Sequence, residues 1–278
     1  MKIKDKDMEI IAEIGWNHMG NLELAESMIQ AAKKAGATCA KFQYWDPTHL
    51  KPGPWDDDGR REIYEKAVLN DAKIYKLMEY CDNEEIDFLI SVFGTIGAKK
   101  MRSLGLTKIK IPSHETTNLA LLEYCSQEYD YIYFSCGASL ESECIDAVEV
   151  LKQGNAKFTL MHCISSYPCP IEKGNLGRLH WLKSLHPNVG FSDHTQSTSL
   201  AALAVACGAS SIEKHFTIDK SLPGRDNQFA LDEAEFTLMS QTINEARLAL
   251  IDHGRDYLDI ESDTVKNYRG RWEPNDYE

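Results

Sequence analysis

Apolar and polar positions alternate along this chain in short segments, and eight of these segments have the pattern of a β-strand. Each segment is a run of apolar, β-branched or aromatic residues bounded by polar or glycine-containing stretches. The predicted strands occupy residues 9–15, 39–45, 87–93, 108–112, 130–137, 158–163, 189–194 and 211–217. The pattern therefore predicts a protein whose chain returns repeatedly to strand structure.

Amphipathic segments occupy the intervals between the predicted strands. One example, ELAESMIQAAKKAG, follows the first strand and ends at Gly36, a residue type that commonly follows the last helical turn. A last helix is predicted over residues 232–251. Eight strand–helix units without a break in composition predict an α/β protein, a single (β/α)8 TIM barrel over residues 1–253 with a polar tail over 254–278. A doubly wound sheet with a second domain is the alternative.

Composition and charge narrow the class of protein. The 278 residues are 43% hydrophobic, no apolar run approaches a membrane span, and the N-terminus lacks a signal-peptide pattern. A formal net charge of −13 argues against binding to nucleic acid or to acidic membranes. The eight cysteines show no CxxC spacing, so reduced thiols are expected. We expect a cytoplasmic protein in which an anionic ligand would need a locally positive pocket.

Polar side chains collect near the carboxyl ends of the predicted strands. Alternate residues of a barrel strand point into the barrel, and one set of alternating positions turns polar toward each strand's end. The polar residues expected at or just beyond these ends are Glu13, Lys41, Gln43, Ser91, Lys110, Ser113, Glu115, Ser135, His162, Ser192, His194, Glu213 and His215. Because active sites of barrel enzymes lie at this mouth, the set predicts one shared pocket.

The histidines of the last two predicted strands suggest a metal site. His194 and His215 fall at the same level of neighbouring strands, and two facing imidazoles near carboxylates suit manganese, iron, cobalt or zinc. A hydrogen-bonded structural pair is the alternative. For His162, a structural role and a place in the pocket are both open. Asp193 and Lys214 have the opposite alternation, so we expect them to point away from the pocket.

Two lysines and four serines suggest an anion site. Lys41 and Lys110 are expected inside the barrel, where an ammonium group needs a charged partner. Glu13 or Glu115 would serve, and so would a bound phosphate or carboxylate. The neighbouring strand ends carry four hydroxyl groups, from Ser91, Ser113, Ser135 and Ser192. Together these donors are suited to a small polyanion.

Seven motifs make the chain resemble the sialic acid synthase (N-acetylneuraminate synthase) family over about residues 8–252. In order they are IAEIGWNHMGNLELA, AGATCAKFQ, KIKIPSHETTN, SCGAS, HCISSYP, GFSDHT and IEKHFTIDKSLPGRD. This family of (β/α)8 barrels condenses phosphoenolpyruvate with an open-chain aldose to give a 2-keto-3-deoxy sugar acid and phosphate. The resemblance implies that the chain is such a transferase, that the metal is manganese, with magnesium or cobalt as alternatives, and that the protein is a homodimer.

The resemblance also implies a role for each matching residue. His194 and His215 would bind the metal. Phosphoenolpyruvate would be bound by Lys41, Ser91, Lys110, Ser113, Ser135 and Ser192. The sugar would be bound by Gln43, Tyr167 and Asp226, with Glu13 and Glu115 as the catalytic carboxylates.

Departures from the family's pattern concern the acceptor sugar. The chain reads PGRD where PGPD is usual and SVFG where STPF is usual, and it matches a short form without the C-terminal antifreeze-like domain. The acceptor is therefore left open between N-acetylmannosamine, a diacetamido-trideoxy sugar and an unmodified sugar. Two other functions also remain: an aldolase that forms a Schiff base through Lys41 or Lys110, and a non-catalytic barrel that binds sugar or serves as a scaffold.

Overall fold

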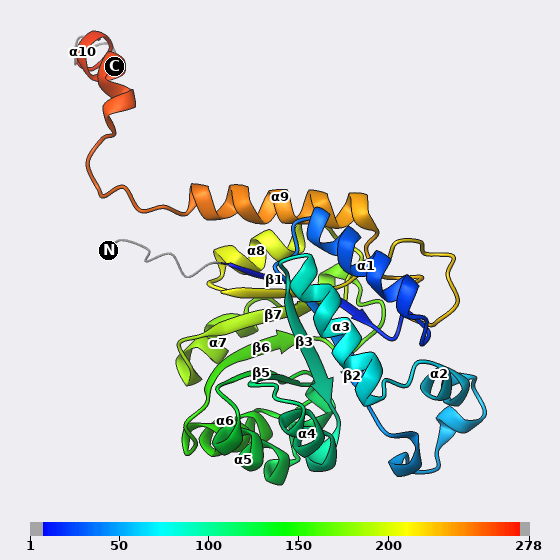
Figure 1. The fold of residues 1–278 in the computed structure, drawn as a ribbon. Helices are drawn as coiled ribbons and strands as arrows, with labels where there is room; N and C mark the ends of the chain where they lie inside the picture. Colours follow the sequence, from blue (N-terminus) through cyan, green and yellow to red (C-terminus); the bar gives the residue numbers. More distant parts are fainter. Residues whose placement is uncertain (1–7, 273–278) are drawn as a thin grey trace.

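Eight parallel strands form a closed barrel in the computed structural model, which describes residues 8–272. Each strand pairs with the next along the chain, and the eighth pairs with the first (Figure 1). The strands are β1 (Glu9–Gly15), β2 (Cys39–Tyr44), β3 (Asp87–Val92), β4 (Lys108–Ile111), β5 (Tyr131–Ser135), β6 (Lys157–Cys163), β7 (Val189–Asp193) and β8 (Ser211–His215). The predicted (β/α)8 barrel is confirmed, and the doubly wound alternative is wrong.

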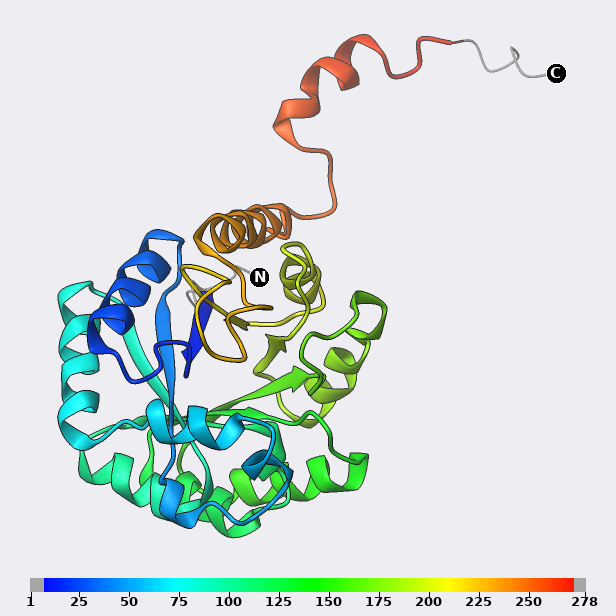
Figure 2. The same cartoon turned by 90° about the vertical axis from the view of Figure 1, so that its right-hand side faces the viewer.

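One helix of the outer ring follows each strand, and the ring surrounds the barrel (Figure 2). The ring consists of α1 (Leu22–Lys34), α3 (Asp71–Asn83), α4 (Gly94–Ser103), α5 (Leu119–Glu128), α6 (Glu141–Lys152), α7 (Arg178–Leu185), α8 (Leu200–Ala206) and α9 (Glu233–Ala249). The side chain of Asn21 caps α1 by accepting a hydrogen bond from the backbone N–H of Leu24. Gly36 follows this helix with φ +94°, and a Cβ there would lie 2.9 Å from Cβ of Ser240 in α9.

The main core lies between the strands and the helices. Its largest fully buried side chains include the aromatic rings of Phe42, Phe134, Phe191, Phe216 and Phe236. A second, smaller cluster contains Ile11, Cys39, Leu89, Tyr133 and Met161. Four of them precede a polar strand-end residue by two positions, and Met161 precedes the pocket-lining Cys163 by two, so these side chains share the inward face. They form an apolar floor beneath the polar mouth of the barrel.

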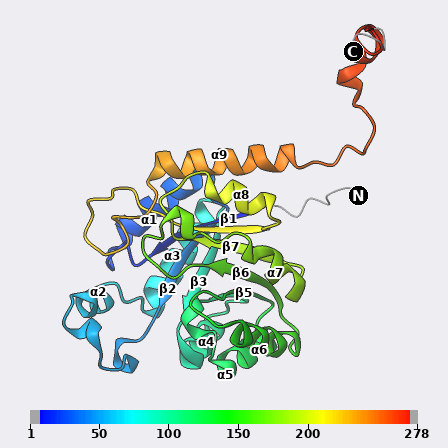
Figure 3. The same cartoon turned by 180° about the vertical axis from the view of Figure 1, so that it is seen from behind.

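The connection between β2 and α3 is long and runs over residues 45–70. It carries two 3₁₀ turns (Pro47–His49 and Pro54–Asp56) and the additional helix α2 (Arg60–Lys66), which stands at the end of β2 (Figures 1 and 3). Its residues Ile63, Tyr64 and Val68 pack against Trp16 and Trp45 in a separate apolar cluster. A long excursion at the carboxyl end of a strand is where this fold builds its ligand sites.

The segment after α9 extends away from the barrel in all three views (Figures 1, 2 and 3). It contains a 3₁₀ turn (Asp259–Glu261) and the short helix α10 (Ser262–Asn267), and its residues are mostly exposed. The barrel mouth is therefore formed by the strands and their loops, without this segment.

Among the described residues, no helix combines the length and apolar character needed to cross a bilayer.

Candidate active site

Two lysines and two glutamates form a buried ion-pair network at the mouth of the barrel. Lys41 Nζ lies 2.7 Å from Glu13 Oε2 and 3.6 Å from Glu213 Oε1. Lys110 Nζ lies 2.9 and 3.1 Å from the two carboxylate oxygens of Glu213. All four side chains are at least 94% buried. Of the partners that the sequence left open, Glu13 pairs with Lys41, whereas Lys110 pairs with Glu213 and not with Glu115.

The network keeps Lys41 and Glu213 ionised despite their burial. Burial alone would lower the pKa of Lys41, but the carboxylates of Glu13 and Glu213 hold that pKa above its usual value. Burial likewise favours the neutral acid of Glu213, but Lys110 and Lys41 hold its pKa well below the ordinary range. The pKa of Glu13 is raised, by burial first and then by the nearby charge of Glu213. Glu13 is thus the network's carboxyl group best suited to accept and return a proton.

Hydroxyl groups surround the lysines. Lys41 donates to Ser91 Oγ at 2.9 Å, and Ser192 Oγ donates to Glu213 at 2.9 Å. The Oγ atoms of Ser113 and Ser165 lie 2.9 Å apart, and the buried Ser135 Oγ has no partner among the described residues. All four predicted serines therefore lie at this mouth. Ser165 was not predicted as a site residue, although HCISSYP places it two residues beyond the inward-facing Cys163.

His194 and His215 face each other beside this network. Their ring centroids are 5.6 Å apart. Nδ1 of His194 lies 2.7 Å from the carbonyl oxygen of Ile164, which fixes its proton on Nδ1 and leaves Nε2, 3.5 Å from Ser192 Oγ, unprotonated. Burial lowers the pKa of His194 to about 4 and that of His215 well below its usual value. Both imidazoles are therefore neutral at pH 7, the form that binds metal ions.

The donor set fits a divalent metal with several open coordination positions. Nδ1 of His215 is buried, 3.5 Å from Asp226 Oδ2, and makes no hydrogen bond with the described residues. Residues 8–272 contain no group of three or more histidine, cysteine, aspartate or glutamate side chains placed to hold a metal. The chain would thus supply two imidazoles and leave the other positions to water and substrate.

His162 does not belong to the pocket. Its Nε2 lies 2.8 Å from the carbonyl oxygen of Gly174, and its ring stacks on Phe191 at 5.5 Å. Met161 and Cys163 occupy the inward positions of β6, so the residue between them points toward the helices. The expectation that His162 joins the strand-end cluster is wrong, and its structural reading is correct.

Asp193 and Lys214 form a second buried pair on the outer face of the barrel. Lys214 Nζ lies 2.7 Å from Asp193 Oδ2 and also donates to the carbonyl oxygens of Thr195 and Ser197. Asp193 in turn accepts from the backbone N–H of Thr195 at 2.8 Å. These contacts hold the loop that follows His194. Both side chains point away from the pocket, as their alternation predicts.

Replacing Lys214 with methionine is expected to destabilise the protein by about 3–5 kcal/mol, because the Asp193 carboxylate is left buried without its cation. Urea unfolding followed by circular dichroism measures this difference. The double variant Asp193→Leu/Lys214→Met serves as the control, since it removes both charges and should recover part of the loss. A loss below about 1 kcal/mol in the single variant would show that the pair is not needed for the fold.

The main pocket, of about 770 Å³, runs from this network to the surface. Three residues predicted to bind the sugar line it: Gln43, Tyr167 and Asp226. The side-chain amide of Gln43 donates to Glu13 Oε1 at 2.5 Å. Glu115 also lines it and accepts from Asn118 at 2.6 Å. Burial and the nearby Glu13 raise the pKa of Asp226 to about 7.

Aromatic side chains form one wall of this pocket, and sequence reasoning missed them. They are Trp16, Trp45, Tyr64 and Phe93. The rings of Trp16 and Trp45 meet edge to face at 5.8 Å, and Trp45 Nε1 donates to the carbonyl oxygen of Tyr64 at 2.9 Å. The motif IAEIGW could have identified Trp16 as a pocket residue, because Trp16 directly follows the strand that carries Glu13.

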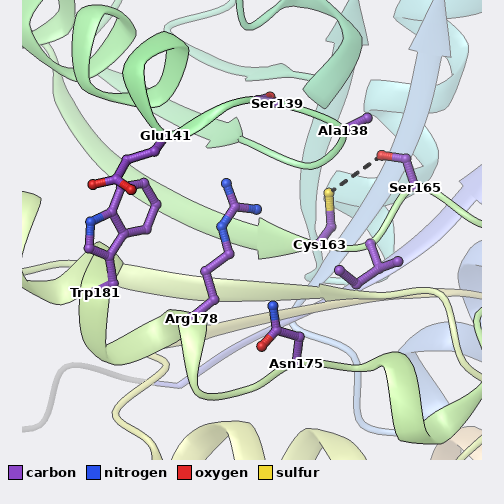
Figure 4. A pocket seen from close by; sticks show the side chains of 9 residues that line it. Ala138, Ser139, Glu141, Cys163, Ser165, Asn175, Arg178 and Trp181 are labelled. Atoms are coloured by element: carbon purple, nitrogen blue, oxygen red, sulfur yellow. Dashed lines mark hydrogen bonds between the residues drawn. The ribbon is translucent and has the colours of Figure 1, made fainter.

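A second hollow, of about 640 Å³, adjoins the main pocket at Cys163 (Figure 4). Arg178 projects into it, with Trp181 and Glu141 at one end and Ser165 at the other (Figure 4). The guanidinium of Arg178 donates to the carbonyl oxygen of Cys136 at 2.8 Å. None of the predicted site residues lines this hollow.

Comparison with known proteins gives a consistent result. The model of the NeuB family matches residues 28–255. An N,N'-diacetyllegionaminic acid synthase of Campylobacter jejuni is 35% identical over 259 residues, covering 87% of this chain and 77% of that protein. A pseudaminic acid synthase of the same species is 34% identical over 276 residues, covering 95% and 80%. The crystal structure of an N-acetylneuraminic acid synthetase from Leptospira borgpetersenii superposes with a TM-score of 0.84 at 29% identity, covering 93% and 90%.

Proposed function

This chain belongs to the NeuB family, and we propose that it joins phosphoenolpyruvate to an amino sugar in a metal-dependent condensation. Its family identifies it as an enzyme that forms carbon–carbon bonds, a synthase of the sialic acid type. The observation that carries the proposal is the buried network of Lys41, Lys110 and Glu213 beside two neutral imidazoles. Cationic donors, an ionised carboxylate and two neutral imidazoles in one pocket support this proposal.

Lys41 and Lys110 hold the phosphate and carboxylate groups of phosphoenolpyruvate in this proposal. Each ammonium group has three N–H donors, and both face the same pocket. Ser91, Ser113, Ser135 and Ser192 add hydroxyl donors around them. Because the side chains of Lys41 and Lys110 are buried, charge-assisted hydrogen bonds from them are stronger than they would be at the surface.

His194 and His215 hold the divalent ion, which we assign as manganese, with magnesium or cobalt as alternatives. When bound, such an ion supplies a Lewis acid that polarises the aldehyde of the open-chain acceptor. The hydrogen bond from His194 to Ile164 fixes the orientation of one imidazole. Asp226 and Tyr167 lie against this pair and position the sugar.

The reaction that fits these groups forms one bond and releases one phosphate. Carbon 3 of phosphoenolpyruvate bonds to the aldehyde carbon, and the aldehyde oxygen takes up a proton from Glu13, whose pKa is raised and which is thereby ionised. Carbon 2 then has cationic character, which the ionised Glu213 stabilises. Water adds to carbon 2 while Glu13 accepts its proton, and the hemiketal phosphate collapses to the ketone as phosphate leaves. The product is a 2-keto-3-deoxy sugar acid.

Replacing Glu13 with glutamine is expected to lower kcat by about 10²- to 10⁴-fold, because the amide cannot accept the proton from water. The KM for phosphoenolpyruvate should change much less. Continuous phosphate-release kinetics measure both quantities. Glu115→Gln is the comparison variant, since its carboxylate is held by Asn118 outside the ion-pair network. A nearly normal kcat in the Glu13→Gln enzyme would show that another group accepts the proton from water.

The aldolase alternative receives no support from the geometry. A Schiff base requires a neutral lysine, and the two carboxylates beside Lys41 hold its pKa above the usual value. Lys110 has its pKa lowered by burial, yet both oxygens of Glu213 hold its ammonium group. We therefore propose that both lysines act as cations.

A further inference from the structure

Two arginines line the outer part of the main pocket. Arg60 belongs to α2, in the long connection after β2, and Arg225 belongs to the loop between β8 and α9. Both loops rise from the carboxyl ends of the strands, on the side where the pocket opens. These guanidinium groups stand at the mouth of a pocket whose floor carries Lys110.

The two arginines differ in how they are paired. Asp58 holds Arg60, accepting from its Nε at 2.7 and 2.9 Å and lying 2.6 Å from its Nη2. Arg225 makes no ion pair within 4.0 Å of any carboxylate among residues 8–272, although Asp58 lies close enough for Arg225 to help lower its pKa after Arg60. Asp58 thus largely neutralises Arg60, whereas the guanidinium of Arg225 keeps N–H donors that no carboxylate among residues 8–272 accepts.

Arg225 lies in the part of the pocket that the far end of a bound acceptor sugar would reach. Its neighbour in the chain, Asp226, is buried and reaches to within 3.5 Å of His215. The side chain of Arg225 is exposed and lines the same pocket nearer the surface. A sugar whose aldehyde lies beside His215 would therefore extend past Asp226 toward Arg225. Arg225 is also the residue that departs from the usual PGPD pattern.

We infer that the acceptor carries a negatively charged group, a phosphate or a carboxylate, at the end remote from its aldehyde, and that Arg225 binds this group together with Arg60. The inference rests on the proposed function, because it takes the aldehyde to lie at His215. The inference restricts the possible acceptors to aldoses that carry a negative charge. Guanidinium groups recognise both anions through paired N–H donors, so the shared chemistry is an oxyanion.

The test compares three acceptors with phosphoenolpyruvate and manganese: N-acetylmannosamine, its 6-phosphate and N-acetylmannosaminuronic acid. Phosphate-release kinetics should give one anionic sugar a kcat/KM about 10- to 100-fold above that of the neutral sugar. A preference for the 6-phosphate identifies a phosphate, and a preference for the uronic acid identifies a carboxylate. Arg225→Pro and Arg225→Gln should each lose the preference without lowering kcat/KM for the neutral sugar, and Arg225→Lys should recover part of it.

Lys220→Gln is the matched control. Lys220 lies in the same loop, pairs with Glu235 at 2.5 Å and does not line the pocket, so the preference should persist. Calorimetric binding of each sugar in the presence of manganese adds a readout that needs no turnover. Turnover with equal efficiency on all three sugars, or a preference that survives Arg225→Gln, overturns the inference while the proposed function stands. If no sugar is turned over, but an anionic sugar binds selectively and Arg225→Gln abolishes that binding, the proposed function is overturned and the anion site is supported. If there is neither turnover nor selective binding, both are overturned.

Discussion

Replacing His215 with alanine is expected to lower phosphate release by about 10³-fold or more and to remove its dependence on manganese. The reason is that His215 supplies one of only two imidazoles that face each other in the pocket, 5.6 Å apart. The barrel should remain folded, because Nδ1 of His215 makes no hydrogen bond with the described residues. Manganese content by elemental analysis, circular dichroism and kinetics separate loss of the metal from loss of the fold.

His114→Ala is the control for this experiment. His114 lines the same pocket but stacks on Phe93 at 5.2 Å, away from the two facing imidazoles. Its replacement should leave the manganese content unchanged. A His215→Ala enzyme that keeps full activity in the presence of a chelator would show that the proposed metal site is wrong.

Replacing Lys110 with alanine is expected to raise the KM for phosphoenolpyruvate by about 100-fold or more, because a buried anion loses its cationic partner. The same change leaves Glu213 with Lys41 as its remaining cation, 3.6 Å away, so unfolding in urea should show a loss of about 3–5 kcal/mol. The double variant Lys110→Met/Glu213→Gln removes both charges. It should recover stability without recovering affinity for phosphoenolpyruvate.

Lys108→Ala provides the comparison on the same strand. Lys108 lies two residues earlier and pairs with Asp87 at 2.7 Å, with about half of its side chain exposed. Its removal should change neither the KM nor the stability by much. An unchanged KM in a folded Lys110→Ala enzyme would make Lys110 a structural residue and remove the main support for the anion site.

The fold and the centre of the site follow from local sequence rules. Strand segments of alternating or continuous apolar residues set the eight strands, and β1 agrees with its prediction at both ends. Glu13 and Lys41 share the inward alternation of neighbouring strands, so a parallel barrel brings them together. His194 and His215 face each other for the same reason, because β7 pairs with β8.

Partners that depend on the assembled barrel were not predictable from the sequence. Lys110 and Glu213 are 103 residues apart, and nothing in either local pattern selects Glu213 over Glu115. His162 shows how an error of one residue in the alternation moves a side chain from the pocket to the helix layer. The aromatic wall depends on how the long loop with α2 folds back, which periodicity does not determine.

The most direct test of the central claim measures phosphate release from phosphoenolpyruvate with manganese and a panel of neutral and anionic aldoses. The account predicts release that requires both the metal and an aldose, with one 2-keto-3-deoxy sugar acid formed for each phosphate, as mass spectrometry can verify. Absence of phosphate with every aldose, in a protein that binds manganese, would contradict the account and favour the non-catalytic barrel.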